Sequence, residues 1–152
     1  EAGRWTEPLR RIKDMQAGGQ SPVLELALAD LIGQAGHAAA MRQLRAAIAA
    51  RTDEVRRVIA ASFPPGTRVS DPPGGLLFWL ELPRGVDTVQ LHQAFLAERI
   101  LVPPGTIFGT GGRFRNCLRI GVGGDWTADH VRALCRVGAL ACAMAAVPRK
   151  AA

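Results

Sequence analysis

The fold is decided by residues 72–83, which read PPGGLLFWLELP. The first four are strong turn formers, and the seven that follow alternate between two faces. One face carries only apolar side chains, those of Leu76, Phe78, Leu80 and Leu82. Pro83 ends the run because proline lacks the N–H group that a strand ladder needs. The segment therefore predicts a turn followed by a strand whose apolar face is buried.

Upstream of this strand, the apolar residues recur with a helical period instead. A helix is predicted over residues 21–36, which open with a Ser-Pro cap and end at a glycine. A longer helix is predicted over residues 37–63, with its apolar side chains on one stripe. Residues 1–20 predict a short amphipathic piece and a loop, and residues 67–70 predict a short strand.

Downstream of Pro83, the pattern predicts a helix, two strands and a final helix. A capping-box spacing opens the helix over residues 87–99. A short buried strand is expected over residues 100–102 and another over 117–122, separated by a loop rich in glycine and proline. The last helix begins at Thr127 and carries its apolar residues on one side.

Together these elements predict an α/β fold with a two-layer α+β architecture, in which a small mixed sheet is covered by helices. A chain of 152 residues, 48% of them hydrophobic, is long enough to bury such a core. No apolar run approaches the ~20 residues that a membrane span needs, so we expect a soluble, cytoplasmic protein without a membrane partner. The spacing of histidines and cysteines does not indicate a metal site.

The net charge of +6 raises the question of nucleic-acid binding. The basic residues are scattered along the chain, are interrupted by acidic ones and are not accompanied by an aromatic series that would stack on bases. We therefore interpret them as a solvated surface.

Arg119 has the clearest chemical meaning in the sequence. It lies in the strand predicted over residues 117–122, where Leu118 and Ile120 point to one face and Arg119 points to the other. A guanidinium keeps its charge, so once desolvated it must meet a carboxylate or a phosphate. Two partners remain open at this point: an internal salt bridge, for instance to Glu81, or a bound ligand.

Three segments follow one another in an order and at a spacing that are typical of one protein family. They are residues 73–83 (PGGLLFWLELP), 100–108 (ILVPPGTIF) and 113–120 (RFRNCLRI). Together they resemble the C-terminal small domain of fold-type I aminotransferases, which depend on pyridoxal phosphate. The resemblance implies that Arg119 binds the α-carboxylate of an amino acid, and that Gly74 and Gly75 bring backbone close to that ligand.

Two stretches resemble one particular group of proteins within this broader likeness. Residues 112–119 (GRFRNCLR) and 63–70 (FPPGTRVS) resemble MocR-type regulators of the GntR family, in which a winged-helix DNA-binding domain precedes an aminotransferase-like domain. This implies an amino acid effector, a homodimer, and contact with DNA only through an N-terminal domain that this chain lacks. A class I/II aminotransferase of the aminoadipate or kynurenine kind is similar over the same stretches, and a free-standing α/β binding module is a third alternative.

The sequence departs from the family in one respect. The cofactor lysine, which lies in a Ser-x-Ser-Lys type of segment, is missing, since Lys13 and Lys150 stand in other contexts. We therefore expect a fragment that has no catalytic residue of its own and is inactive in transamination by itself. Residues 1–36 would be a remnant of the large cofactor-binding domain with its linking helix, and residues 37–152 the small domain. The absence of the large domain would leave an apolar surface exposed on residues 21–62.

Overall fold

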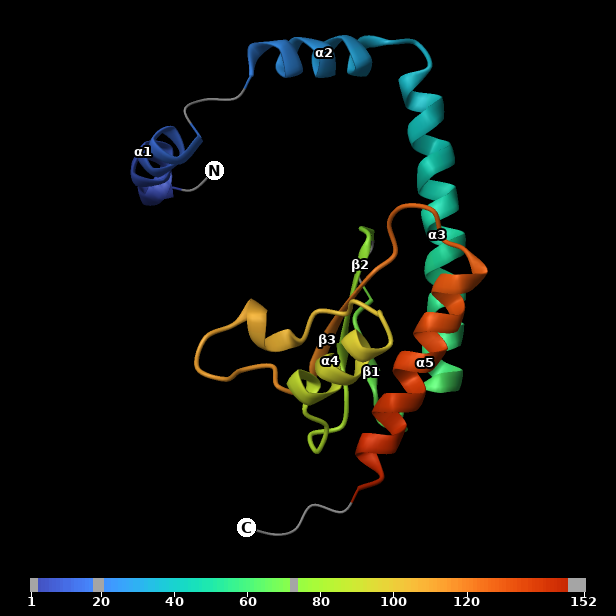
Figure 1. Cartoon of the computed structure of the whole chain (residues 1–152). Coiled ribbons are helices and arrows are strands. Elements are labelled where there is room, and N and C mark those ends of the chain that lie inside the picture. The colour runs from blue at the N-terminus through green and yellow to red at the C-terminus, as the bar shows by residue number, and fades with distance from the viewer. Residues whose placement is uncertain (1–2, 18–20, 72–73, 148–152) are drawn as a thin grey trace. The chain divides into compact units, whose positions relative to one another are not determined.

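The computed structural model describes residues 3–17, 21–71 and 74–147 (Figure 1). Some of the sequence-based predictions lie outside these residues: the turn prolines Pro72 and Pro73, and the loop at 18–20. Within the described residues, no helix combines the length and the apolar character that crossing a bilayer requires.

The first of two compact units, Glu1–Leu44, is helical. It holds the 3₁₀ turn η1 (Gly3–Trp5), α1 (Thr6–Ala17), α2 (Pro22–Gly33) and the beginning of α3 (His37–Ser62). α2 begins where the Ser-Pro cap predicts, with Ser21 in extended backbone and Pro22 at its start. The helices expected over residues 21–36 and from His37 onward are therefore confirmed.

α2 is apolar over most of its circumference. Six large apolar side chains are each at least 49% exposed: Val23, Leu24, Leu26, Leu28, Leu31 and Ile32. At 3.6 residues per turn these positions spread over roughly two-thirds of the helix surface. A helix of this kind normally occurs where its surroundings bury it. For α2, this confirms the exposed apolar surface expected on residues 21–62. Toward the end of that range the expectation is wrong, because Val55 and Ile59 are buried in the core of the second unit.

The second unit, Arg45–Ala152, is built on a three-stranded antiparallel sheet. Its strands are β1 (Arg68–Val69), β2 (Leu77–Glu81) and β3 (Cys117–Gly121), in the order β1-β2-β3. Trp79 of the central strand lies opposite Arg119 of β3. Residues that face each other in an antiparallel pair project to the same side of the sheet, so Trp79 and Arg119 share a face.

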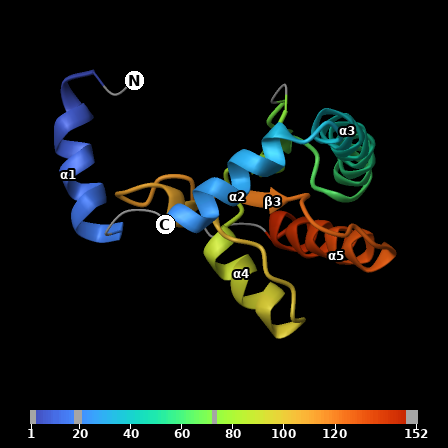
Figure 2. The ribbon, with the colours of Figure 1, turned by 90° about the horizontal axis from the view of Figure 1, so that it is seen from above.

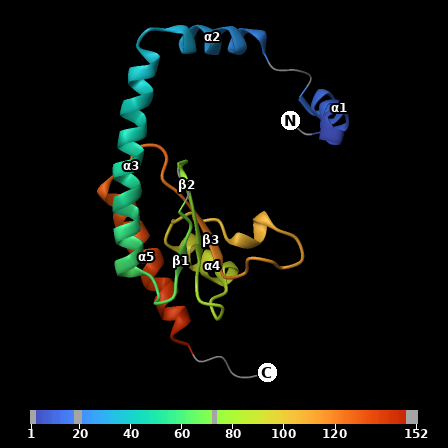
Figure 3. The ribbon, with the colours of Figure 1, turned by 180° about the vertical axis from the view of Figure 1, so that it is seen from behind.

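The helices of this unit cover one face of the sheet: the C-terminal half of α3, α4 (Thr88–Ala97) and α5 (Ala128–Ala145). Figures 1 and 3 show α5 beside α3 from opposite sides. A Cβ on Gly138 of α5 would lie 2.5 Å from the backbone oxygen of Ser62, so the two helices meet closely. The core between the layers contains Val55, Ile59, Phe78, Leu80, Phe95, Leu118, Ile120, Leu134 and Val137. The two-layer architecture is therefore confirmed.

The other face of the sheet is covered by a loop. Figure 2 places the segment of residues 103–116, gold to orange, on the side of β3 away from α3 and α5. This segment contains the 3₁₀ helix η2 (Gly105–Phe108), and its Phe108 contacts Trp79 and Arg119. Among the described residues of this unit, no α-helix contributes to that face.

Two details of the expected sheet need correction. No strand forms over residues 100–102, and contact with β3 is reduced to one bridge between Pro104 and Leu118. The reason is the Pro103-Pro104 pair, which lacks the N–H groups that would extend a ladder. The strand pairs of the described residues are all antiparallel, so the sheet is not mixed.

α4 is fixed at both ends. The side chain of Asp87 caps its first turn. At the other end, Arg99 adopts a left-handed backbone with φ of 58°. Its N–H donates to the carbonyl of Leu96 at 2.9 Å, and the N–H of Ile100 donates to the carbonyl of Phe95 at 2.8 Å. These two bonds form a Schellman motif, which ends the helix and turns the chain toward β3.

Candidate functional site

Arg119 lies in the middle of β3, on the face of the sheet that the helices leave free. Its backbone is held on both sides, since it pairs with Trp79 on β2 and its N–H donates to the carbonyl of Pro103 at 3.2 Å. Leu118 and Ile120, which point to the other face, are buried in the core. The strand thus fixes the direction of the arginine side chain, which is half-buried.

The guanidinium of Arg119 has an aromatic neighbour. Its Cζ lies 4.2 Å from the ring centroid of Phe108, in cation–π geometry. Within the described residues it forms no salt bridge, and Glu81, the alternative partner, instead lies 3.9 Å from Arg68. No described carboxylate therefore occupies its N–H groups, and their geometry suits a carboxylate held as a two-pronged fork.

Three aromatic side chains line this face of the sheet, and we call them the aromatic cluster: Trp79, Phe108 and Phe114. The rings of Trp79 and Phe108 meet edge to face with centroids 5.8 Å apart, and those of Trp79 and Phe114 do so at 5.3 Å. The guanidinium of Arg119 therefore rests on an apolar floor. A charge-assisted hydrogen bond formed there is stronger than one formed in water.

A pocket of about 330 Å³ adjoins Arg119. Residues 99–103, the outer edge of β3 and the N-terminal part of α5 enclose it. The indole Nε1 of Trp126 is buried without a hydrogen-bond partner among the described residues, and the ring of His130 stacks on Trp126 at 5.3 Å. A mainly apolar pocket with a few polar groups is typical of small-molecule sites.

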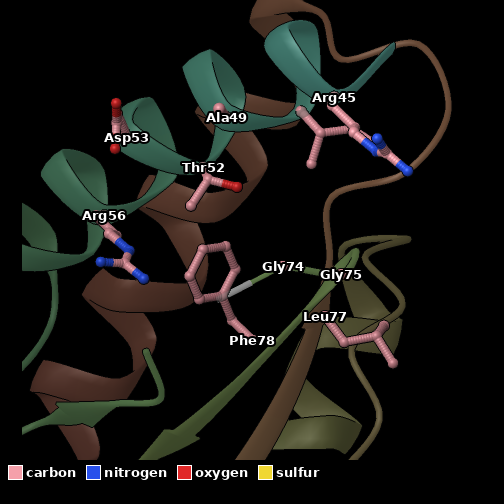
Figure 4. Close-up of a pocket in the computed structure, with 10 residues that line it drawn as sticks. Arg45, Ala49, Thr52, Asp53, Arg56, Gly74, Gly75, Leu77 and Phe78 are labelled. Carbon is pink, nitrogen blue, oxygen red and sulfur yellow. The ribbon is translucent and has the colours of Figure 1, made fainter. Parts of the chain in front are cut away.

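Gly74 and Gly75 line a second pocket, of about 450 Å³, between α3 and the start of β2 (Figure 4). Gly75 has φ of +105°, a conformation that favours glycine. A Cβ added at either glycine would meet no described atom within 4 Å. Among the described residues, the two glycines and Arg119 do not line the same pocket. Their approach to a ligand stays a prediction.

The second pocket holds an arginine whose charge is already paired. Figure 4 shows the guanidinium of Arg56 beside the ring of Phe78, with Arg45 at the other end of the pocket. The Cζ of Arg56 lies 5.5 Å from the centroid of the Phe78 ring. Arg56 also forms a salt bridge with Asp71. Arg56 therefore has the internal partner that Arg119 lacks among the described residues.

Cys117 lies on the same face of β3 as Arg119, two residues away. Burial raises the pKa of its thiol, and the nearby carboxylate of Glu81 adds to the effect. The thiol thus stays protonated near neutral pH and points to the side-chain oxygen of Asn116 at 3.8 Å. A protonated, buried thiol is a poor nucleophile, so Cys117 contributes packing to this face.

Trp79 and Phe108 have no role in the sequence-based prediction of the site. Trp79 offers a usable signal, because it occupies the non-core position of an alternating strand, where a polar residue is expected. Phe108 offers none, because it lies in a loop without periodicity.

Comparison with known proteins decides the family. The sequence profile of aminotransferase class I and II matches residues 4–137. The chain belongs to this family.

Two relatives of this aminotransferase-family chain are regulators of Escherichia coli strain K12. The chain is 27% identical over 139 residues to YdcR, an uncharacterized HTH-type transcriptional regulator, and the match covers 91% of this chain and 30% of YdcR. It is 28% identical over 136 residues to YjiR, described in the same words, and that match covers 90% of this chain and 29% of YjiR. The chain therefore spans less than a third of either regulator.

Among solved structures, the chain resembles LysN, an alpha-aminoadipate aminotransferase of Thermus thermophilus. The TM-score is 0.77 at 20% identity, and the match covers 92% of this chain and 36% of LysN. That structure holds N-(5'-phosphopyridoxyl)-L-leucine. At this identity the likeness shows the fold, which is that of the corresponding part of an aminotransferase.

The aminotransferase family depends on pyridoxal phosphate, and the described residues do not by themselves fit this cofactor. The cofactor needs a lysine to form a Schiff base and a partner for its ring nitrogen. Lys13, the lysine among the described residues, is exposed on α1 and stands in a Leu-Arg-Arg-Ile-Lys-Asp segment rather than in a Ser-x-Ser-Lys type of segment. We therefore assign no step on the cofactor to this chain. The described residues also contain no group of three or more His, Cys, Asp or Glu side chains arranged to hold a metal ion.

Proposed function

We propose that this chain is the C-terminal part of a MocR-type transcriptional regulator of the GntR family. In this proposal, other parts of the protein supply a winged-helix DNA-binding domain and the domain that holds pyridoxal phosphate. The present chain supplies the small aminotransferase-like domain, which binds the carboxylate of an amino acid effector. Support comes from two HTH-type regulators that each match at least 90% of the chain, while the chain spans only 30% and 29% of them.

The ligand part of the proposal rests on the state of Arg119. Its guanidinium lies over the ring of Phe108 and has no salt bridge among the described residues, and in this proposal the adjoining pocket of about 330 Å³ takes the side chain of the amino acid. An unpaired guanidinium on a rigid strand suits a carboxylate, because two parallel hydrogen bonds fix both position and orientation. An amino acid held in this way has its Cα bonds oriented for a partner domain.

The signal would be a closure of the small domain around the amino acid. A ligand shifts such an equilibrium only when it binds one arrangement better than the other. The amino acid meets this condition if it contacts Arg119 and the cofactor-binding domain at once, because both contacts exist only in the closed arrangement. Closure of this hinge type is then passed on to the DNA-binding domain.

The same proposal divides the chain at residues 36 and 37. Residues 1–36 belong with the cofactor-binding domain and its linking helix, and residues 37–152 form the small domain. The exposed apolar surface of α2 supports this division, because a neighbouring domain of a longer protein would bury it. A cytoplasmic homodimer, with Gly74 and Gly75 near the ligand, completes the proposal.

The second candidate function is a metabolic class I/II aminotransferase, in which the same closure serves turnover. Membership of aminotransferase class I and II over residues 4–137 favours it. The coding sequence upstream separates the two candidates. A winged-helix segment there supports the regulator, and a protein that starts directly in the cofactor-binding domain supports the enzyme.

The decisive experiment measures DNA binding and turnover on the full-length protein loaded with pyridoxal phosphate. Each standard L-amino acid is added singly, together with a 2-oxo acid as amino acceptor, to the protein mixed with a DNA fragment from upstream of the gene. The regulator predicts that at least one amino acid changes DNA affinity. DNA binding that no amino acid changes, together with release of oxo acid, would establish the enzyme instead. A free-standing binding module predicts neither activity.

A further inference from the structure

We propose that Phe108 is a positioning residue for Arg119: its ring holds the guanidinium in the orientation that receives the amino acid carboxylate. The inference rests on the proposed function, because that function assigns the carboxylate to Arg119. It adds a residue that acts through Arg119 and lies in a loop rather than on the sheet.

The contact between the two residues suits this role. The Cζ of Arg119 lies 4.2 Å from the centroid of the Phe108 ring, well inside the ~6 Å range of cation–π attraction. A cation–π contact is made with the face of the ring and needs no hydrogen-bond acceptor on it, so the five N–H donors of Arg119 are not committed to an acceptor on Phe108. Phe108 therefore restrains Arg119 without using the donors that a carboxylate needs. A salt bridge would restrain Arg119 equally well but would occupy those donors.

The ring of Phe108 is itself held in place. Its centroid lies 5.8 Å from that of Trp79, with the ring planes at 74°, and Trp79 meets Phe114 at 5.3 Å and 86°. Trp79 lies directly across the sheet from Arg119. Strand pairing fixes Trp79 and Arg119 to each other, and both contact Phe108. Each of the three residues is therefore held by the other two. A rotation of the ring away from Arg119 would also break its contact with Trp79.

The backbone around Phe108 is clamped at two glycines. A Cβ on Gly105 would lie 2.5 Å from the carbonyl oxygen of Phe114, and a Cβ on Gly109 would lie 2.9 Å from the Phe114 ring. Such close approaches exist only because glycine has no side chain. η2 thus lies against the Phe114 segment at its first residue and just after its last, so Phe108 is presented from a fixed turn.

The alternative is that Phe108 only covers apolar surface, independently of the charge on Arg119. The two roles differ in their energetic coupling. A positioning residue loses its effect when the group that it positions is removed, whereas a residue that only packs keeps its effect.

The test is a double-mutant cycle on the full-length protein loaded with pyridoxal phosphate. The probe is the standard L-amino acid that binds most tightly, and the readouts are its Kd and the Kd of the cofactor. Phe108→Leu is expected to weaken the amino acid about 2- to 30-fold, the range of a lost cation–π contact. Phe108→Tyr keeps the aromatic face and should restore binding close to that of the wild type. In an Arg119→Ala background, Phe108→Leu should have no further effect.

The outcomes separate this inference from the function on which it rests. If Phe108→Leu weakens the amino acid equally with and without Arg119, or not at all in the wild type, the inference is overturned while the proposed function stands. If Arg119→Ala leaves amino acid binding unchanged, the proposed function fails and the inference with it. Leu96→Ala, on exposed α4 surface, is the matched apolar truncation and should change neither Kd. Phe108→Met, apolar but without a ring, replaces Phe108→Leu if the latter does not fold.

Discussion

The two faces of the three-stranded sheet are built from the same strands but by different physical rules. On the helix-covered face, Phe78, Leu80 and Leu118 are at most 2% exposed and gain stability from burial. On the other face, Trp79 and Arg119 are half-buried and both contact Phe108 of the loop. Alternation along a strand therefore does two tasks at once: one residue in two builds the core, and the next is free to serve a ligand.

Leu80→Ala gives the largest expected effect and tests the core side of this comparison. Leu80 is 0% exposed, so its truncation leaves a cavity and should cost about 2–5 kcal/mol in the free energy of unfolding. Leu77→Ala, three residues earlier, is the control, because Leu77 is 51% exposed and should cost less than about 1 kcal/mol. Urea unfolding of both variants measures the difference. Equal losses would show that the two faces are not distinct in stability.

Arg119→Ala tests the other face. It should weaken amino acid binding to the cofactor-loaded, full-length protein by about 1.5–3 kcal/mol, or roughly 10- to 150-fold, because a charge-assisted pair is lost. Cofactor affinity should stay close to that of the wild type, since no bond to the cofactor is removed. Arg132→Ala, on exposed α5 surface, controls for the loss of a positive charge. Isothermal titration measures both ligands, and a parallel loss of both would indicate a folding defect.

Most helices and strands that build the core could be predicted from the sequence, because their apolar residues recur at regular spacing. α2, α3 and α5 were predicted because their apolar residues recur at helical spacing, and β2 and β3 because theirs alternate. The strand expected over residues 100–102 was wrong, since a short apolar run also fits a loop when prolines follow it. A strand pairs only if its backbone N–H groups can donate to a neighbouring strand. The pattern of apolar residues carries no information about these donors.

On the loop-covered face, the sequence identifies one residue of the candidate site but not the residues around it. Arg119 was identified because a lone charge interrupts an apolar strand. Its neighbour Phe108 depends on the path of a loop that is set by close approaches at Gly105 and Gly109 and by a left-handed backbone at Phe114. Each of these features follows from tertiary packing, which one sequence does not reveal.

Asp87 connects the helix layer to the loop side, because it caps α4 and also pairs with Arg115. Asp87→Ala removes both interactions and should cost about 0.5–2 kcal/mol in the free energy of unfolding at neutral pH. Asp87→Asn should cost less, because the amide oxygen still accepts from the backbone of the first turn. Urea unfolding of the three proteins measures the order of stability.

The contribution of Asp87 should also depend on pH. Burial alone would raise the pKa of Asp87, but the hydrogen bond from Arg115 and two backbone N–H groups outweigh it and lower the pKa below its usual value. A lowered folded pKa means that the carboxylate stabilises the fold above the unfolded value of ~3.9, and that this stabilisation is lost as the pH falls through the folded value. The difference between wild type and Asp87→Asn should therefore shrink as the pH falls below the unfolded value and through the lowered folded value. A difference in stability that does not change with pH would contradict a stabilising ion pair between Asp87 and Arg115.

Arg99→Gly has the smallest expected effect. It tests the turn that leads from α4, on the helix-covered face, toward β3. Arg99 has φ of 58°, a conformation that costs a residue with a Cβ more than it costs glycine. The variant should raise the free energy of unfolding by about 0.5–1 kcal/mol, which urea unfolding can measure. Arg84→Gly is the control, because Arg84 is exposed and is not among the described residues with positive φ. It should be neutral or destabilising.

Arg99 also lines the pocket beside Arg119, so the same variant tests where the carboxylate binds. If the carboxylate meets Arg119 on the loop-covered face, Arg99→Gly should change amino acid affinity far less than Arg119→Ala does. A loss as large as that of Arg119→Ala would place the carboxylate at the edge of β3 instead, between residues 99–103 and α5. The ligand would then bind beside the edge of β3, where residues 100–102 form no strand, and the contrast between the two faces would no longer explain binding.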